Sequence, residues 1–132
     1  MNIKSEQAML EYGRDFAKRI KAPIVIELVG DVGVGKTTFV RGLAEGLGVK
    51  EAVTSPSFTI SKEYALPGGG SLIHYDFYRL PEPGLMVDDL MEKINDSKNI
   101  VVIEWGESVA NLLPENHVKI EIEYSEKGRE IK

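Results

Sequence analysis

Residues 30–37 have the sequence Gly30-Asp31-Val32-Gly33-Val34-Gly35-Lys36-Thr37, which fits the pattern G-x-x-x-x-G-K-[ST] of a phosphate-binding loop. A run of strand-forming residues, 24–29, precedes this loop, and a helical pattern over residues 35–47 follows it. The glycines allow the backbone to bend so that successive N–H groups point at one anion. The start of the helix offers further unpaired N–H groups to the same anion. The stretch therefore predicts a nucleotide-binding protein.

The residue types within the loop predict separate tasks. Lys36 supplies a positive charge for the β- and γ-phosphates, and Thr37 supplies a hydroxyl for Mg²⁺. We therefore expect ATP and Mg²⁺ as cofactors. The residues of this segment that are expected to bind the nucleotide are Asp31, Val32, Gly33, Val34, Gly35, Lys36, Thr37 and Thr38.

Length and composition narrow the class of protein. The chain has 132 residues, which predicts a single domain spanning residues 1–132. It contains no cysteine, so disulfides, thiolate catalysis and cysteine-bound zinc are excluded. The first residues lack the apolar segment of a secretory signal, and no apolar run could span a bilayer, which predicts a cytoplasmic protein without a membrane partner. The net charge of −5 gives no general attraction for nucleic acid.

The hydrophobic patterns predict an α/β fold with a P-loop NTPase-like sheet. The sheet is expected to have a mostly parallel core, with antiparallel hairpin strands and flanking helices added to it. Gly42 and Gly46 lie four residues apart on the helix after the loop, and we expect them to allow close packing on the sheet. The expected helices are 5–20, 35–47 and 84–97, and the expected strands are 24–29, 57–65, 71–78, 100–103 and 117–124, with a glycine-rich turn at 68–70.

Two carboxylates stand at the ends of predicted strands. Asp76 ends the segment 72–76, and Glu104 ends the segment 100–104. Ligands of open parallel sheets bind beyond the carboxyl ends of the strands, so both acids are expected near the loop. We assign Asp76 to Mg²⁺ and Glu104 to the attacking water, although the residue types alone allow the two roles to be exchanged. The structural alternative for Asp76 is an ion pair with Arg79. The structural alternative for Glu104 is an ordinary acid at a strand end.

Other polar and aromatic residues are weaker candidates. Thr54 and Ser57 follow the phosphate-binding helix, where their hydroxyls could reach Mg²⁺ or the terminal phosphate, or could cap a turn. Trp105 either packs on the nucleotide or a partner, or belongs to the core. His74 lies two residues before Asp76, on the same face of a strand, and we expect a hydrogen-bonded supporting role for it.

Four motifs in this order resemble the TsaE family of small bacterial P-loop ATPases: GDVGVGKTT at 30–38, TSPSFT at 54–59, HYDFYRL at 74–80 and IEWGE at 103–107. The resemblance implies a role in making threonylcarbamoyladenosine (t6A) on tRNA, with two partner proteins, TsaB and TsaD, and with tRNA held mainly by the partners. It places Lys36 and Thr37 on phosphate and Mg²⁺, Asp76 in a Walker-B-like role and Glu104 near the γ-phosphate. It places Thr54 and Ser57 in a switch-like segment and Trp105 beside the site. Thr37, Asp76 and Glu104 are thus the candidate metal ligands, and Lys36, Asp76 and Glu104 the candidate catalytic residues.

Three other functions compete with a partner-modulated, Mg²⁺-dependent ATPase. A nucleotide-gated binding module with negligible hydrolysis is the closer rival, because low intrinsic activity is expected when a partner completes the site. A small-molecule kinase is disfavoured, since such enzymes need a lid with clustered arginines and the five arginines here are dispersed. A GTPase is disfavoured because the guanine-reading motif Asn-Lys-x-Asp is absent from the sequence.

Overall fold

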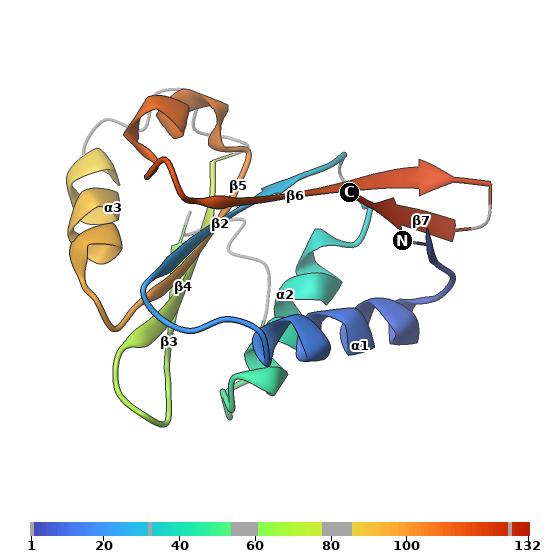
Figure 1. The fold of residues 1–132 in the computed structure, drawn as a ribbon, viewed down its shortest axis with the longest axis horizontal. Helices are drawn as coiled ribbons and strands as arrows, with labels where there is room; N and C mark the ends of the chain where they lie inside the picture. The colour runs from blue at the N-terminus through green and yellow to red at the C-terminus, as the bar shows by residue number, and fades with distance from the viewer. Residues whose placement is uncertain (1, 32, 54–60, 78–85, 127) are drawn as a thin grey trace.

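The structure is a computed structural model that describes residues 2–31, 33–53, 61–77, 86–126 and 128–132. In these residues, helices pack on both faces of one sheet (Figure 1). The elements in chain order are β1 (Asn2–Ile3), α1 (Glu6–Ala17), β2 (Ile24–Val29), α2 (Lys36–Gly46), β3 (Ser61–Ala65), β4 (Ser71–Asp76), α3 (Met86–Asn95), β5 (Ile100–Glu104), the 3₁₀ helix η1 (Gly106–Leu112), β6 (Val118–Ser125) and β7 (Gly128–Ile131).

The sheet has a parallel centre and antiparallel edges. Its seven described strands follow the order β1-β7-β6-β2-β5-β4-β3. β2 is parallel to both of its neighbours, β5 and β6, and β4 is parallel to β5. β3 is antiparallel to β4 at one edge, while β7 pairs antiparallel with β6 and with the N-terminal β1 at the other. This arrangement confirms the predicted fold class.

The central strand is covered on both faces, as its apolar sequence predicts. Side chains alternate between the faces, so Ile26 and Leu28 of β2 belong to one core cluster and Val25 belongs to the other. The larger cluster packs under α1 and α2, and the smaller one packs under α3 and η1, which lie on opposite sides of the sheet in Figure 1. The phosphate-binding sequence connects β2 directly to α2, so the loop lies at the carboxyl end of the central strand.

The small residues of α2 pack differently from the prediction. We expected Gly42 and Gly46 to face the sheet, but a side-chain carbon on Gly42 would stand 2.2 Å from the carbonyl oxygen of Leu10 in α1. A carbon on Gly46 would stand 2.6 Å from the Cβ of Ala17, also in α1. The glycines therefore allow α1 and α2 to approach each other, and the earlier expectation was wrong because it assigned them to the wrong neighbour.

Segment ends differ from the predictions by a few residues. The predicted helix 84–97 is observed as α3 from Met86, and the predicted strand 57–65 is observed from Ser61, with residues 54–60 and 78–85 outside the described part of the chain. β1, β7 and η1 were not predicted. None of the described helices combines the length and apolar character needed to cross a membrane.

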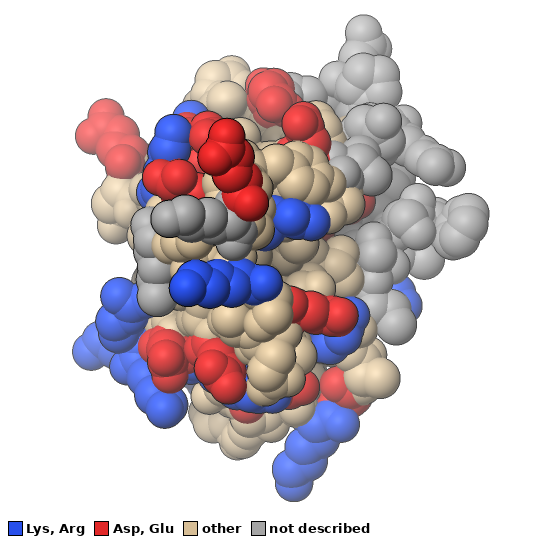
Figure 2. All heavy atoms as spheres, turned by 90° about the vertical axis from the view of Figure 1, so that its right-hand side faces the viewer, with Lys and Arg blue, Asp and Glu red and all other residues tan. Residues whose placement is uncertain are grey.

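The face that carries the β6–β7 end of the sheet has mixed charge. In Figure 2, Lys and Arg side chains are interleaved with Asp and Glu side chains, and neither sign forms a continuous area. Within the described residues of this hairpin, Lys132 pairs with Glu123 at 3.1 Å and Lys119 pairs with Glu121 at 3.5 Å. Among the described residues, this face shows no continuous basic stripe of the kind that attracts nucleic acid.

Candidate functional site

The loop between β2 and α2 has the backbone geometry of an anion cradle. Gly33 and Gly35 adopt positive φ angles of 81° and 114°, which other residues rarely adopt. A Cβ on Gly30 would stand 2.7 Å from the carbonyl oxygen of Ile122, so only glycine fits there. Gly35 is the N-cap of α2 and provides no side chain to cap the first N–H groups of the helix. Those groups are therefore available to an anion at the loop.

Lys36 is buried at the first turn of α2, with a relative exposure of 6%. Its Nζ donates a hydrogen bond of 2.5 Å to the carbonyl oxygen of Gly30 and lies 3.7 Å from Oε1 of Glu104. The ammonium also lies 4.2 Å from the centroid of the Trp105 ring. Burial lowers the pKa of Lys36, and the nearby carboxylates of Glu104 and Asp76 act in the opposite direction.

Glu104 occupies the last position of β5, a strand that is buried at every residue. The parallel register pairs Glu104 with Leu28 of β2 on one side and with Asp76 of β4 on the other. The structure therefore brings the two predicted strand-end acids into adjacent positions, next to the strand that leads into the loop. Oε2 of Glu104 accepts a hydrogen bond from Nε2 of His74.

His74 is fully buried in β4, with 0% exposure. Its Nε2 bonds to Glu104, but its Nδ1 is buried without a hydrogen-bond partner within the described part of the chain. An unsatisfied buried polar atom lowers the stability of a fold by about 1–3 kcal/mol, so the unpartnered Nδ1 of this imidazole destabilises the protein. The predicted supporting role of His74 therefore has a defined partner, the Glu104 carboxylate.

The remaining predicted residues surround this cluster. Asp31 and Gly33 are exposed, Val34 is buried, and Thr37, Thr38 and Asp76 are half-buried. Trp105 is half-buried and has left-handed backbone angles of φ 57° and ψ 49°, which turn the chain immediately after Glu104. It packs against the smaller core cluster while its ring faces Lys36, so it combines core packing with a position beside the site. Four predicted residues, Val32, Thr54, Ser57 and Arg79, lie outside the described residues.

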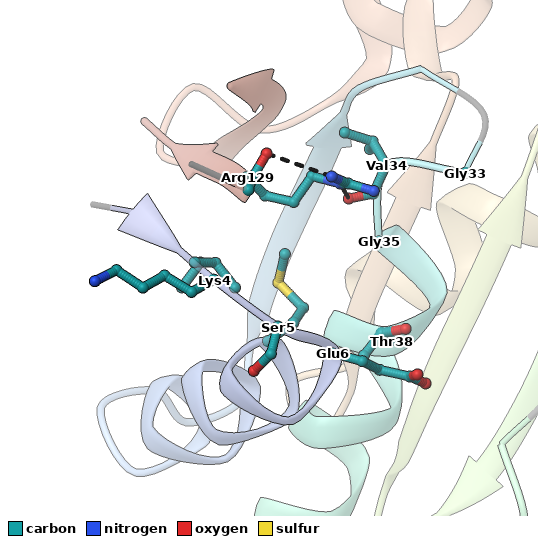
Figure 3. A pocket seen from close by; sticks show the side chains of 11 residues that line it. Lys4, Ser5, Glu6, Gly33, Val34, Gly35, Thr38 and Arg129 are labelled. Atoms are coloured by element: carbon teal, nitrogen blue, oxygen red, sulfur yellow. Dashed lines mark hydrogen bonds between the residues drawn. The ribbon is translucent and has the colours of Figure 1, made fainter. Parts of the chain in front are cut away.

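A cavity of about 430 Å³ adjoins the loop, and the sequence analysis missed most of its lining. Gly33, Val34, Gly35 and Thr38 form one wall, and the opposite wall comes from the start of α1 and from β7 (Figure 3). The residues on that second side include Lys4, Ser5, Glu6, Met9 and Arg129. They are far from the loop in sequence, and the two-residue strand β1 that positions several of them has no periodicity to detect.

The β6–β7 hairpin contacts the loop directly. Nε of Arg129 donates a hydrogen bond of 3.1 Å to the carbonyl oxygen of Val34, which Figure 3 shows as a dashed line. The Arg129 guanidinium lies 4.2 Å from the ring centroid of Tyr124, whose hydroxyl is the nearest atom to a Cβ built on Gly33. The hairpin therefore supports the outer side of the loop.

The residues present fit a magnesium–nucleotide site better than a preformed metal cage. No group of three or more His, Cys, Asp or Glu that could hold a metal occurs among the described residues. Mg²⁺ bound with a nucleotide needs only one or two protein oxygens in addition to phosphate oxygens and water. Thr37, Asp76 and Glu104 provide a hydroxyl and two carboxylates around the loop, which matches that requirement.

Comparison with known proteins gives one consistent result. The family described as "Threonylcarbamoyl adenosine biosynthesis protein TsaE" matches residues 3–131. A relative from Streptomyces coelicolor, the tRNA threonylcarbamoyladenosine biosynthesis protein TsaE, is 41% identical over 87% of this chain and 78% of its own. The protein of the same name from Haemophilus influenzae is 34% identical over 98% of this chain and 84% of its own.

The fold agrees with a solved structure. The crystal structure of Bacillus subtilis YdiB matches this chain with a TM-score of 0.74 and 33% identity. The match covers 96% of this chain and 78% of the YdiB chain. A family match over nearly the whole chain, relatives at 34% and 41% identity and a shared fold lead to the same assignment, so this chain belongs to the TsaE family.

Proposed function

We propose that this chain is a single-domain, Mg²⁺-dependent ATPase that supports t6A biosynthesis on tRNA. The observation that carries the proposal is the convergence of the Lys36 ammonium with the carboxylate of Glu104 and the strand end at Asp76. A buried cation and two acids meet at the loop that offers its N–H groups, which is the set of groups that phosphoryl transfer to water requires.

Each group has a task in this proposal. The Lys36 ammonium, which here bonds to the Gly30 carbonyl, would bind the β- and γ-phosphates, and the hydroxyl of Thr37 and the carboxylate of Asp76 would hold Mg²⁺. Mg²⁺, when bound, neutralises charge on the phosphate oxygens. The Glu104 carboxylate would orient the attacking water or contact the metal, since its Oε1 lies 3.7 Å from the Lys36 ammonium. The family resemblance assigns the hydroxyls of Thr54 and Ser57, which lie outside the described residues, to the terminal phosphate. Trp105, whose ring lies beside Lys36, would enclose the site.

The cavity beside the loop gives the nucleoside a place to bind. Its volume of about 430 Å³ lies within the range of small-molecule sites. Met9 and Val34 offer apolar surface, and Ser5, Glu6 and Thr38 offer polar groups around it. With the phosphates on the loop, we propose that the adenosine of ATP occupies this cavity.

The biological setting follows from the family. Relatives carry the name of a tRNA threonylcarbamoyladenosine biosynthesis protein, so we propose the same pathway for this chain, in the cytoplasm. The resemblance to the family suggests TsaB and TsaD as the partners. The net charge of −5 supports indirect contact with tRNA through those partners.

Hydrolysis with radiolabelled ATP tests the proposal. Mg²⁺-dependent release of free phosphate, measured with and without TsaB and TsaD, is expected for the wild type and is expected to be lost in Lys36→Ala. Transfer of label to a metabolite would indicate a kinase instead. Tight Mg²⁺-dependent ATP binding with no phosphate release under either condition would indicate the nucleotide-gated binding module, and normal turnover in Lys36→Ala would contradict the assigned site.

A further inference from the structure

We propose that His74 is a positioning residue for ATP hydrolysis. It holds one oxygen of the Glu104 carboxylate, so that the other oxygen remains directed at Lys36 and the phosphate site. The inference rests on the proposed function and deepens it, because it assigns a role to a buried residue that lies outside the phosphate-binding loop.

The two oxygens of Glu104 have different partners. Oε2 accepts the hydrogen bond from Nε2 of His74, while Oε1 lies 3.7 Å from Nζ of Lys36. His74 and Asp76 are two residues apart in β4 and share a face, and Asp76 is the register partner of Glu104. The sheet register therefore fixes His74 beside Glu104, and the hydrogen bond fixes the rotation of the carboxylate about its last bond.

A second His–Glu pair shows what a structural histidine looks like in this fold. His117 uses both ring nitrogens: Nδ1 lies 2.7 Å from the carbonyl oxygen of Pro114, and Nε2 lies 3.2 Å from Oε1 of Glu27. His74 uses one, and its Nδ1 is buried without a partner within the described part of the chain. An aliphatic side chain at the His74 position would avoid the unsatisfied Nδ1, but it would leave Oε2 of Glu104 without this partner. What the imidazole adds is its bond to Glu104.

Loss of this bond has a defined consequence. A carboxylate released by His74 can rotate toward the Lys36 ammonium, since the two groups already stand 3.7 Å apart. A closer Lys36–Glu104 pair would turn the carboxylate away from the attacking water. The loss is therefore expected mainly in kcat, because orientation in the transition state is what the bond maintains.

The test compares His74→Leu with its matched control His117→Leu. We expect His74→Leu to lower kcat by about 10- to 100-fold, the usual cost of losing a residue that orients a ligand in a metal-dependent site. The dissociation constant for ADP without Mg²⁺ should change little, because this measurement does not depend on Glu104. His117→Leu should lose thermal stability and keep the kcat of the wild type. Equal losses of kcat in both variants, or a His74→Leu loss explained by a lower folded fraction, would overturn the proposal.

A double-mutant cycle distinguishes positioning of Glu104 from a purely structural role of His74. In a Glu104→Gln background, His74→Leu should cause no further loss of kcat, since the oriented carboxylate is already absent. Additive losses would overturn the proposal. If His74→Leu does not fold, His74→Gln and His74→Asn replace it. The glutamine amide can reach Glu104 and should retain most of the activity, whereas the shorter asparagine should not, and equal activities would overturn the proposal.

Failure of the proposed function is distinguishable from failure of this inference. If the wild type releases no phosphate from ATP with or without the partner proteins, hydrolysis itself is refuted. The same variants are then compared by calorimetry with ADP and Mg²⁺. His74→Leu should weaken the effect of Mg²⁺ on ADP binding in the wild-type background and leave it unchanged in the Glu104→Gln background. A Mg²⁺ effect equal to that of the wild type would overturn the positioning role.

Discussion

The pairs His74–Glu104 and His117–Glu27 have the same chemistry in two regions of the molecule. The first lies at the carboxyl ends of β4 and β5, on the face covered by α1 and α2, and its side chains are 0% and 5% exposed. The second lies on the opposite face, where Glu27 of β2 meets His117 before β6, and its side chains are 24% and 13% exposed. The first has a lysine beside it and an unsatisfied nitrogen, whereas every ring nitrogen of the second has a partner.

This difference separates a pair that serves a site from a pair that serves the fold. A fully partnered, partly exposed pair joins two segments at modest cost to the stability of the fold. A fully buried pair with an unpartnered atom costs the fold stability, and such groups are retained where they orient a reactive group. The position of a pair relative to the strand ends therefore says more about its role than its residue types do.

The largest expected effect comes from replacing the carboxylate in each pair. Glu104→Gln should lower the rate of ATP hydrolysis by about 100-fold or more, because it removes the group that orients or activates water. Glu27→Gln should leave the rate close to that of the wild type. Steady-state phosphate release under saturating Mg²⁺ and ATP measures both. Similar losses in the two variants would show that the two pairs do not differ in the proposed way.

The second test compares two lysines. Lys36→Met should weaken ADP binding by about 10- to 100-fold, since a hydrogen bond from a charged group to phosphate contributes about 1.5–3 kcal/mol. Lys93→Met, which removes a surface partner of Glu63 at 3.0 Å, should leave the affinity unchanged. Titration calorimetry with ADP gives both dissociation constants. Unchanged affinity in Lys36→Met would place the phosphates elsewhere.

The third test moves from the strand ends to the helices that support the loop. Gly42→Ala should destabilise the fold by about 1–3 kcal/mol, because the added carbon meets the Leu10 backbone at 2.2 Å. Gly68→Ala is the control, since no atom lies within 4 Å of a Cβ at that position. Urea unfolding followed by circular dichroism measures the two free energies. Equal stabilities would contradict the close approach of α1 and α2.

The smallest expected effect concerns the exposed pair Glu63–Lys93. The hydrogen bond from Lys93 lowers the pKa of Glu63 below its usual value. A carboxyl with a lowered pKa in the folded state stabilises the fold above its unfolded pKa, and this contribution is lost as the pH falls through the folded pKa. The free energy of unfolding of the wild type should therefore exceed that of Glu63→Gln by about 0–1 kcal/mol at neutral pH, and this difference should disappear in acid. A difference that grows as the pH falls would contradict the assignment.

The sequence predicted the parts of the site that local patterns encode. The loop at 30–37 carries its own signature, and Asp76 and Glu104 end apolar strands, so their meeting at one edge follows from a parallel sheet. The same alternation predicted that His74 shares the face of Asp76. It did not identify Glu104 as the partner of His74, because that requires the order of β4 and β5 within the sheet.

The parts that could not be predicted depend on distant contacts. The cavity wall at Ser5 and Arg129 exists because β1 pairs with β7 across the whole length of the chain. Gly42 and Gly46 signalled close packing, but a spacing of four residues on α2 does not say whether the neighbour is a sheet or another helix. The left-handed conformation of Trp105 carries no sequence signal, since tryptophan rarely adopts it.

Fluorescence of Trp105 tests the central claim most directly. Trp105 is the only tryptophan of the chain, and its ring faces the ammonium that the account assigns to the phosphates. Addition of ADP with Mg²⁺ should draw Lys36 away from the ring and change the emission in a saturable way, and Lys36→Met should abolish the change. A wild-type emission that stays constant while calorimetry detects bound nucleotide would contradict the account, because the phosphates would then lie away from Lys36.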